Sequence, residues 1–409
     1  MAERFVVVGA NLAGGTAAAV LRDEGFEGEV VLVGEEPRPP YERPPYSKEY
    51  LRGERSFEQT LVRPAGFWDE HGIETRFGVR AVRIDPADRM VELDDGDRLP
   101  YDAVLVATGC RNRRLRVPGA DLDGVLDLRT VDDADRIRAA AVSASSGGRA
   151  VVVGLGFIGC EVAASLVGQG LEVAAIEPLP APLHRVLGEE VGRVIEGIHR
   201  DRGVGVFLGD AVASFEGAGR VEAVLTAQGR RLPCDVAVVG VGVEPVTEVL
   251  AGTGVEVANG VVVDELCRTN VEGIYAAGDV ARHYHPIAGR HVRVEHWQNA
   301  LKQGQAAARS MMGKGTPYED VHWFWSEQYE HNIQYTGFHG PWDALVVRGS
   351  LEDRSFVGFY LEEGRVRGAV ALDRGRDLRR AMPLVRKAAT VSPDVLRDES
   401  VDLRKALSP

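Results

Sequence analysis

Two glycine-rich turns have the residue spacing that holds a phosphate group. The first reads Gly9-Ala10-Asn11-Leu12-Ala13-Gly14 and the second reads Gly154-Leu155-Gly156-Phe157-Ile158-Gly159. Between a strand and a helix, such a turn aims the amides of the helix N-terminus at a pyrophosphate. The second turn matches the full pattern, whereas Asn11 replaces the middle glycine of the first. Asparagine tolerates positive φ better than most residues, so we expect the first turn to bind as well. The alternative is a bare connection without a ligand.

An acidic residue follows each turn at the distance that suits a ribose. Glu35 lies 21 residues after Gly14, and Glu177 lies 18 residues after Gly159. A carboxylate at the end of the following strand accepts hydrogen bonds from ribose hydroxyls. Glu177 would also repel a 2′-phosphate, which predicts a preference for NADH over NADPH. A solvated acid at a strand end is the alternative for Glu177.

Both turns need flanking strands and a helix, and the hydrophobic pattern supplies them twice. Short β-branched runs predict strands, and the apolar stretch after each turn predicts a helix. The order strand, helix, strand occurs at Phe5–Val8, Gly14–Arg22 and Val30–Val33, and again at Ala150–Val153, about Gly159–Gly168 and Glu172–Ile176. Continuous apolar strands are typical of parallel sheets covered on both faces, so the sequence predicts a duplicated α/β unit.

Further strands extend these units, and the end of the chain changes character. Three strands end at a glycine turn: Ala103–Ala107 before Thr108-Gly109, Val236–Val241 before Gly242, and Gly273–Ala277 before Gly278-Asp279. Within residues 78–102, the alternating run before Asp94-Asp95-Gly96 predicts a hairpin. From about residue 317 onward, alternating strands predict a separate α+β domain, at Ala344–Arg348, Val357–Leu361 and Val366–Leu372.

Composition excludes several classes of protein. The chain has 409 residues, a formal charge of −13 and 48 glycines, which suits a multidomain globular protein with many turns. The acidic balance argues against non-specific binding of nucleic acid. No apolar stretch approaches the about 20 residues of a membrane helix. The first strand begins too near Met1 to leave room for a signal peptide, so we expect a cytoplasmic protein without a membrane partner.

Cysteines and histidines give no signature of a metal site or a dithiol. Four cysteines are spread through the chain, at Cys110, Cys160, Cys234 and Cys267. None forms a C-x-x-C pair, and we interpret Cys110 and Cys160 as structural. Four histidines crowd one segment, at His283, His285, His291 and His296. No carboxylate or thiol spacing accompanies them, so no metal site is predicted.

Three further segments point to one family of flavoproteins. They are Tyr41-Glu42-Arg43-Pro44-Pro45-Tyr46-Ser47-Lys48, Val294-Glu295-His296-Trp297-Gln298-Asn299-Ala300 and Phe324-Trp325-Ser326. Together with the glycine turns, Ala107-Thr108-Gly109 and Ala276-Ala277-Gly278-Asp279, the chain resembles reductases of the glutathione-reductase type. It is most similar to the ferredoxin reductases of oxygenase systems, the family of putidaredoxin reductase, rubredoxin reductase and the biphenyl dioxygenase ferredoxin reductase. The resemblance covers essentially the whole chain.

The resemblance implies an α/β fold with two Rossmann-like dinucleotide-binding domains and a C-terminal α+β domain. Residues 1–113 and 244–316 would bind FAD, residues 114–243 would bind NADH, and residues 317–409 would form the C-terminal domain. Trp323 and Trp325 in that last part would cover the flavin, shape a partner surface or belong to the core.

The resemblance also gives three residues a catalytic role. Lys48 would lie near flavin N5, where a positive charge stabilises the reduced ring, and Glu161 would meet both Lys48 and the nicotinamide. Trp297 would lie beside the flavin ring. The alternatives are a surface lysine, an acid that complements the helix dipole, and a core tryptophan. Tyr46 replaces the leucine usual in this family and makes the wall there bulkier and more polar.

The predicted cofactor-binding residues come from the turns and from positions that match the family. For FAD they are Gly9, Asn11, Leu12, Ala13, Gly14, Glu35, Arg43, Lys48, Ala81, Ala107, Thr108, Gly109, Arg129, Gly278, Asp279, Glu295, His296 and Trp297, with Asp279 at the ribityl chain. For NADH they are Gly154, Gly156, Phe157, Ile158, Gly159, Glu161, Glu177, Arg185, Val241 and Gly242.

The missing cysteines separate this chain from related enzymes. Disulfide reductases, NADH oxidases and peroxidases of this type carry redox cysteines shortly after the first unit, but residues 36–52 contain none. A diffusible one-electron carrier is then the simplest acceptor. The sequence predicts hydride transfer from NADH to FAD and electron transfer to a [2Fe-2S] ferredoxin that serves a cytochrome P450 or a ring-hydroxylating dioxygenase.

Two alternatives to this function stay open. An NADH oxidase or a small-molecule reductase, such as one for monodehydroascorbate, would use the same flavin half-reaction. A flavin-bearing interaction protein of the apoptosis-inducing-factor kind would share the fold. The basic stretch Arg374–Arg380 either docks an acidic ferredoxin or is the solvated face of a helix. The sequence is compatible with a monomer or a homodimer.

Overall fold

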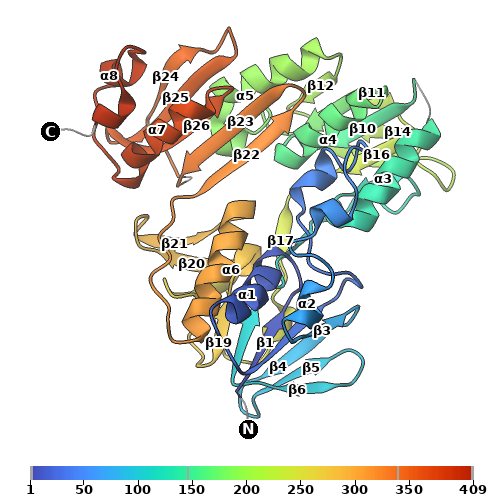
Figure 1. Cartoon of the computed structure of the whole chain (residues 1–409). Coiled ribbons are helices and arrows are strands. Elements are labelled where there is room, and N and C mark those ends of the chain that lie inside the picture. The colour runs from blue at the N-terminus through green and yellow to red at the C-terminus, as the bar shows by residue number, and fades with distance from the viewer. Residues whose placement is uncertain (1–2, 145–146, 339, 407–409) are drawn as a thin grey trace. The chain divides into compact units, whose positions relative to one another are not determined.

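The computed structural model describes residues 3–144, 147–338 and 340–406, and the chain divides into two compact units. The first unit comprises Met1–Glu42, Phe57–Arg111 and Val243–His322. The second comprises Arg43–Ser56, Asn112–Gly242 and Trp323–Pro409. Each unit is therefore built from three separate stretches of chain, as the colours of Figure 1 show. The three predicted domains stay a prediction, because compact units need not coincide with binding domains.

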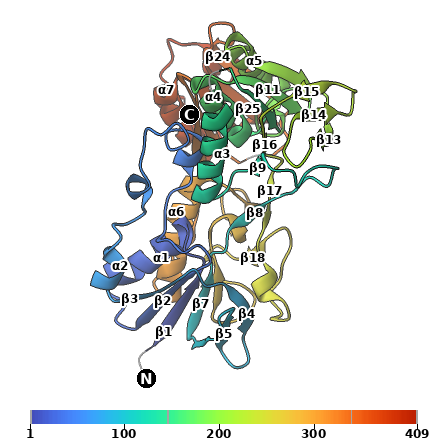
Figure 2. The ribbon, with the colours of Figure 1, turned by 90° about the vertical axis from the view of Figure 1, so that its right-hand side faces the viewer.

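A five-stranded parallel sheet forms the centre of the first unit, in the order β19-β7-β1-β2-β3. Its strands are β1 (Arg4–Val8), β2 (Glu29–Gly34), β3 (Ile73–Phe77), β7 (Ala103–Val106) and β19 (Ile274–Ala276). Residues of β1 alternate between two cores, one on each face of the sheet. Helix α1 (Leu12–Asp23) packs against α6 (Trp297–Met311), and Figures 1 and 2 show the two side by side.

Two small sheets and several short elements complete the first unit. One sheet contains β4 (Ala81–Asp85), β5 (Met90–Leu93) and β6 (Arg98–Pro100). It confirms the predicted hairpin and adds β4 to it. The other contains β18 (Val261–Val263), β20 (Ala281–His285) and β21 (Arg290–Arg293). The short elements are α2 (Phe67–Glu70), η2 (Glu58–Thr60), η3 (Glu248–Leu250) and η4 (Gly278–Val280).

The second unit repeats the same plan around the sheet β12-β11-β10-β16-β9. Its parallel strands are β9 (Val125–Asp127), β10 (Arg149–Val153), β11 (Glu172–Glu177), β12 (Gly205–Leu208) and β16 (Val236–Val239). Its helices are α3 (Val131–Ala144), α4 (Phe157–Gly168) and α5 (His184–Asp201), with the turn η1 (Pro44–Ser47). An antiparallel sheet is added by β13 (Val212–Glu216), β14 (Ala223–Thr226) and β15 (Arg231–Pro233). Both predicted strand-helix-strand repeats are confirmed.

The C-terminal part of the second unit is an antiparallel sheet in the order β22-β23-β26-β25-β24. Its strands are β22 (Trp323–Gln328), β23 (His331–Gly337), β24 (Ala344–Ser350), β25 (Ser355–Glu362) and β26 (Arg365–Leu372). Helix α7 (Gly375–Arg386) packs on it, followed by α8 (Pro393–Arg397) and η5 (Leu403–Lys405). The predicted fold class is confirmed, and within this sheet the hydrophobic pattern missed β22 and β23.

Two short strands, β8 (Cys110–Asn112) and β17 (Val243–Pro245), lie where the chain passes from one unit to the other. Within the described residues, none of the helices combines the length and the apolar character needed to cross a membrane.

Candidate active site

Close backbone contacts shape the first glycine turn. Gly9 has φ +114°, which favours glycine, and a Cβ there would lie 2.2 Å from the carbonyl oxygen of Ala107. A Cβ on Gly14 would lie 1.9 Å from the carbonyl oxygen of Gly9. The turn therefore presses against the loop after β7. Helix α1 begins within the turn, so its first amides lie at the carboxyl edge of the sheet, where dinucleotides bind.

The middle position of the turn does not adopt a positive φ, which corrects the basis of the prediction for Asn11. The prediction relied on tolerance of positive φ, but Asn11 has φ −104° and ψ −165°. Its counterpart Gly156 has φ −73° and ψ −176°, and a Cβ there would meet nothing within 4 Å. Both backbones are extended, so Asn11 fits the turn without strain.

The loops after β7 and β19 lie beside the first turn. Thr108 follows β7, and its hydroxyl donates to the carbonyl oxygen of Val246 at 2.6 Å. Gly278 follows β19 with φ +80°, and a Cβ on it would lie 2.9 Å from the Cβ of Ala13. The predicted residues Ala13, Gly278 and Asp279 are thus brought together in the first unit.

The end of β2 lies beside the start of β4. The backbone N–H of Val79 donates to the carbonyl oxygen of Gly34 at 3.0 Å, so Ala81 comes near the strand that leads into Glu35. The side chain of Glu35 is exposed. Its position at the carboxyl end of β2 is the one predicted, and its contact with a ribose stays a prediction.

The N-terminus of α6 carries the aromatic residue predicted beside the flavin. Trp297 is the first residue of the helix, and it packs partly buried against the core that contains α1. His296 is the N-cap residue, and burial lowers the pKa of His296 to about 4. Glu295 is exposed and pairs with Arg293 at 2.7 Å. These residues share one helix end, and their contact with FAD stays a prediction.

The second turn repeats the close contacts of the first. Gly154 has φ +93°, and a Cβ there would lie 2.4 Å from the carbonyl oxygen of Gly240. A Cβ on Gly159 would lie 1.9 Å from the carbonyl oxygen of Gly154. Val241 and Gly242 follow directly, so the loop after β16 borders this turn as the loop after β7 borders the first.

Aromatic residues of the C-terminal sheet lie next to α4. Phe157, the first residue of α4, meets Phe324 edge to face with ring centroids 4.7 Å apart. Ile158 is 47% exposed in the same helical turn. Trp323 and Trp325 stack on each other at 5.4 Å on the other face of β22 and are half-buried. They are therefore not core residues, which excludes that alternative.

Glu177 is built into the second turn. It is 8% exposed, and its carboxylate accepts from the backbone N–H groups of Leu155 at 2.7 Å and Leu179 at 3.0 Å. This contradicts the alternative of a solvated strand-end acid. Arg185 is exposed in the first turn of α5, two residues after Leu183, whose N–H donates to the carbonyl oxygen of Leu155 at 2.8 Å. Both predicted residues thus border the turn.

A buried ion pair joins Lys48 to Glu161 within the second unit. The Lys48 Nζ lies 2.9 Å from Glu161 Oε2, and the two residues are only 4% and 3% exposed. Ser47 donates its hydroxyl to the same carboxylate oxygen, and Ser326 donates to Oε1 at 2.7 Å. Such a pair is retained in a protein interior only when further hydrogen bonds satisfy it. The surface-lysine and helix-dipole interpretations are therefore wrong.

The same network continues deeper into the second unit. The Gln328 side chain donates to Ser326 Oγ at 3.2 Å and accepts from His199 Nε2 at 3.1 Å, while the Tyr329 hydroxyl lies 3.0 Å from His199 Nδ1. Burial lowers the pKa of His199 to about 4, so its ring is neutral. Sequence reasoning missed these four residues. Only Ser326 gave a signal, through the segment that resembles the family.

The remaining predicted residues near η1 also belong to the second unit. The Arg43 guanidinium donates to the carbonyl oxygen of Arg129, whose own N–H is held by Asp133 at 3.0 Å. Tyr46 is 1% exposed and meets Tyr50 edge to face at 4.6 Å. Arg43 and Arg129 are thus brought together, and Tyr46 fills the interior of this unit.

Comparisons with known proteins decide the family. Residues 3–304 match the family described as pyridine nucleotide-disulphide oxidoreductase, and residues 323–407 match the reductase C-terminal domain. The chain belongs to the pyridine nucleotide-disulphide oxidoreductase family. The resemblance to ferredoxin reductases of oxygenase systems is confirmed as well, because relatives are named as ferredoxin reductases of a dioxygenase system and of the CYP199A2 system.

Three relatives illustrate this likeness. Rhodocoxin reductase of Rhodococcus erythropolis is 40% identical over 407 residues, which cover 99% of this chain and 94% of the relative. The anthranilate 1,2-dioxygenase system ferredoxin–NAD(+) reductase component of Burkholderia cepacia is 38% identical over 410 residues, covering 99% and 100%. The crystal structure of the covalent putidaredoxin reductase–putidaredoxin complex matches with a TM-score of 0.95 and 34% identity, covering 99% and 98%.

Pyridine nucleotide-disulphide oxidoreductases and ferredoxin–NAD(+) reductases use FAD and NAD(H), as the resemblance implied. The residues present fit two such dinucleotides. In each turn, the first and last glycines let strand and helix approach closely, and the helix N-terminus follows at the carboxyl edge of a parallel sheet. No acidic side chain lies in the first turn of α1 or α4, so nothing there repels a pyrophosphate.

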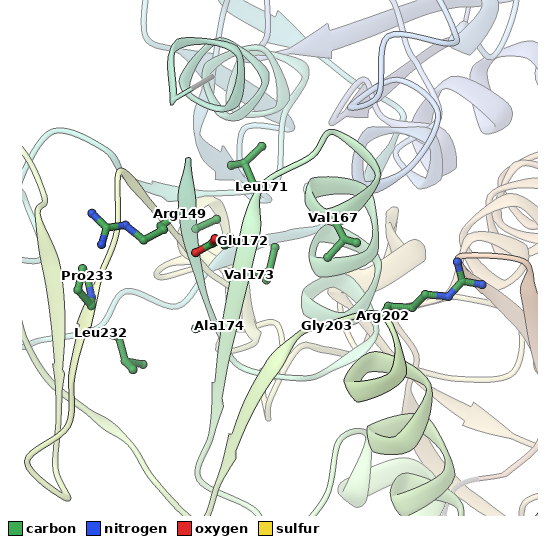
Figure 3. Close-up of a pocket in the computed structure, with 11 residues that line it drawn as sticks. Arg149, Val167, Leu171, Glu172, Val173, Ala174, Arg202, Gly203, Leu232 and Pro233 are labelled. Carbon is green, nitrogen blue, oxygen red and sulfur yellow. The ribbon is translucent and has the colours of Figure 1, made fainter. Parts of the chain in front are cut away.

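The second unit also contains a pocket of about 510 Å³ that is distinct from the dinucleotide turn (Figure 3). Arg149 and Glu172, the first residues of β10 and β11, line it together with Leu232 and Pro233. Dinucleotides in this family's folds bind at the carboxyl ends of strands, whereas this pocket lies at the amino ends. Gly154 follows the opposite end of β10, so the pocket is not the predicted NADH site.

The crowded histidines are partly brought together. His283 and His285 lie near His322, whereas His291 is exposed and packs its ring against Tyr284. Sequence reasoning considered the segment around His283 alone and did not connect it to His322, which is distant in the chain.

Proposed function

We propose that this protein is an NADH-dependent reductase that delivers electrons through FAD to a [2Fe-2S] ferredoxin serving a cytochrome P450 or a ring-hydroxylating dioxygenase. The state of its thiols carries the proposal. All four cysteines are free and buried, and burial raises the pKa of Cys160 well above the usual range and that of Cys234 to about 12. Such thiols are poor redox partners. Electrons that arrive from NADH therefore leave to an external acceptor, and the relatives include ferredoxin reductases of oxygenase systems.

The bound FAD supplies the chemistry that converts a hydride from NADH into single electrons. We assign the amides of α1 to the FAD pyrophosphate and those of α4 to the NADH pyrophosphate. Glu161 faces the ammonium group of Lys48 at 2.9 Å, and Ser47 and Ser326 fix that carboxylate with hydrogen bonds. We assign Lys48 to the flavin N5 edge, Trp297 to the flavin ring and Glu161 to the nicotinamide, as the family resemblance implies.

Glu177 supports a preference for NADH. Two backbone N–H groups already hold its carboxylate, so its position is fixed before NADH binds. A carboxylate has about four lone-pair positions, which leaves acceptors for ribose hydroxyls. Arg185 borders the same turn and would attract a 2′-phosphate. The preference for NADH over NADPH therefore depends on the balance between the negative charge of Glu177 and the positive charge of Arg185.

Anaerobic reduction tests the proposal. FAD-loaded protein is mixed with NADH and with NADPH in parallel, and then with a [2Fe-2S] ferredoxin and cytochrome c as the reporter. We expect NADH to bleach the flavin faster than NADPH, and cytochrome c to be reduced only when ferredoxin is present. Flavin bleaching with no effect of ferredoxin, followed by rapid oxygen consumption once air is admitted, would instead identify an NADH oxidase. Slow bleaching with a persistent charge-transfer band would identify an interaction protein.

The basic segment Arg374–Arg380 is the candidate docking surface for a ferredoxin. Arg374 pairs with Asp377 at 2.7 Å and with Glu399 at 2.8 Å, and Arg380 lies 3.4 Å from Asp377. Because acidic neighbours offset these arginines, we favour the solvated helix face over a ferredoxin dock.

We expect a cytoplasmic protein that is a monomer or a homodimer. Light scattering of the purified protein measures the oligomeric state.

A further inference from the structure

Three histidines gather inside the first unit. His283 and His285 are two residues apart in β20, so both side chains lie on the same face of this strand. His322 is the last residue of the first unit. One ring nitrogen from each of the three lies within 4.8 Å of the others, and all three residues are buried. Their rings meet at centroid distances of 5.1 to 5.9 Å. Buried imidazoles packed this closely need something that satisfies their nitrogens.

His283 is the residue that most needs a partner. Its side chain is 0% exposed, and among the described residues neither Nδ1 nor Nε2 has a hydrogen-bond partner. An unsatisfied buried polar group costs about 1–3 kcal/mol. A neutral imidazole keeps a lone pair on its unprotonated nitrogen, which it can offer to a cation.

His285 is oriented as metal-binding histidines usually are. Its Nε2 lies 3.0 Å from the carbonyl oxygen of Asp320, which makes Nε2 the protonated nitrogen and Nδ1 the one with a lone pair. Nδ1 accepts a long hydrogen bond of 3.4 Å from the N–H of Ala288, which a stronger interaction can replace.

We propose that His283, His285 and His322 form a binding site for Zn²⁺ or a similar borderline divalent cation. Neutral imidazoles suit zinc, copper and nickel, whereas magnesium and calcium require oxygen ligands. At a Zn–N distance of about 2.0–2.1 Å, nitrogens on one tetrahedral ion are about 3.4 Å apart. Each ring therefore has to move by less than about 1 Å, and a water completes the coordination.

The surroundings support a cation at this place. The negative charges of Glu319 and Asp320 act on His285 and partly balance an ion there, although Asp320 also pairs with Lys302 at 2.8 Å. Tyr318 packs beside His283 but donates its hydroxyl to Asn299 at 3.1 Å, so it shields the site and is not a ligand. A bound ion would tie the segment before β22 to β20 and so stabilise the first unit.

Metal analysis of the FAD-loaded full chain tests the proposal. Protein is produced in zinc-supplemented medium, washed with a weak chelator and analysed for zinc by mass spectrometry. We expect about one zinc per chain in the wild type and in His291→Ala, whose histidine is exposed in the same segment. We expect at least a tenfold loss in His322→Ala and in His285→Asn. FAD content and circular dichroism verify that each variant is folded.

Thermal unfolding gives a second readout that does not depend on purification history. Zinc added to chelator-stripped wild type should raise Tm, because a ligand bound only by the folded state stabilises it. The rise in Tm should persist in His291→Ala. It should disappear in His322→Ala and in His285→Asn, provided that the variant is folded. Zinc-free wild type without a rise in Tm overturns the proposal, and so does equal zinc loss in His291→Ala.

Discussion

The two glycine turns have the same steric frame but use the acid after the second strand differently. In both, the last glycine would place a Cβ 1.9 Å from the carbonyl oxygen of the first. Glu35 of the first unit is exposed, whereas Glu177 of the second is 8% exposed and holds the backbone of its own turn. Both turns therefore need glycine where the strand and the helix approach each other. The acidic residue at the end of the second strand is not constrained in this way, and in the second unit it stabilises the turn.

The helices after the turns differ as well. Glu161 of α4 and Thr16 of α1 occupy the same position, seven residues after the first glycine of each turn. Glu161 is bound by Lys48 and two serines, whereas the buried Thr16 hydroxyl has no hydrogen-bond partner among the described residues. Duplicated units can thus share a backbone while only one of them builds a buried polar network.

Replacing the last glycine should have the largest effect. Gly159→Ala places a Cβ 1.9 Å from a carbonyl oxygen, a distance that real structures do not show, so α4 has to shift away from β10. We expect loss of more than about 4 kcal/mol in the free energy of unfolding, or failure to fold. Gly156→Ala, where a Cβ meets nothing within 4 Å, is the matched control. Urea unfolding compares them, and equal stability of the two variants would refute the steric frame.

Breaking the ion pair should come next. Glu161→Gln leaves the buried ammonium group of Lys48 without a carboxylate, which should lower the free energy of unfolding by about 3–5 kcal/mol. Thr16→Val, at the equivalent position of α1, removes a hydroxyl without a partner and should change it by less than about 1 kcal/mol. Similar losses in both variants would show that the polar side chains at this position of α4 and α1 contribute equally to stability.

Acid should weaken the network through His199. The folded-state pKa of about 4 lies below the ordinary 6.5, so the unfolded chain takes up the proton first. The stabilisation by the neutral ring is complete above pH 6.5 and is lost as the pH falls towards 4, with a total of about 3 kcal/mol. Urea unfolding of the wild type and His199→Gln measures it. The difference in free energy of unfolding between the two proteins should shrink as the pH falls from 6.5 to 4. A constant difference would contradict the role of neutral His199.

The strand-end acids should give the smallest contrast. Glu177→Gln replaces a charged acceptor of two backbone N–H groups, so we expect a loss of about 2 kcal/mol in stability and a weaker preference for NADH. Glu35→Gln alters an exposed side chain and should stay within about 0.5 kcal/mol. Unfolding curves measure the stability, and the ratio of kcat/KM for NADH and NADPH measures the preference.

Local patterns predicted what depends on neighbouring residues. The strands at Phe5–Val8 and Ala150–Val153 and the hairpin at Asp94-Asp95-Gly96 follow from periodicity and turn chemistry, and all are present. The contact between Lys48 and Glu161 followed only from the family resemblance, because 113 residues separate them. No pattern in one sequence brings Ser326 or His322 to their sites, since packing of distant segments decides those contacts. The strand β22 was missed because its three aromatic residues are consecutive and its buried face contains the polar residues Ser326 and Gln328, so no apolar–polar alternation marks it.

The three-part assembly of the second unit affects the order in which the protein can be made. Lys48 leaves the ribosome 113 residues before Glu161, and Ser326 follows Glu161 by another 165 residues. At about 5–20 residues per second, the lysine waits roughly 10–60 s for the last of these partners. Neither unit is complete before its third stretch, Val243–His322 or Trp323–Pro409, has been synthesised. Most of the chain must therefore stay soluble as a nascent polypeptide, so slow translation or an early stop exposes apolar strands of both units to aggregation.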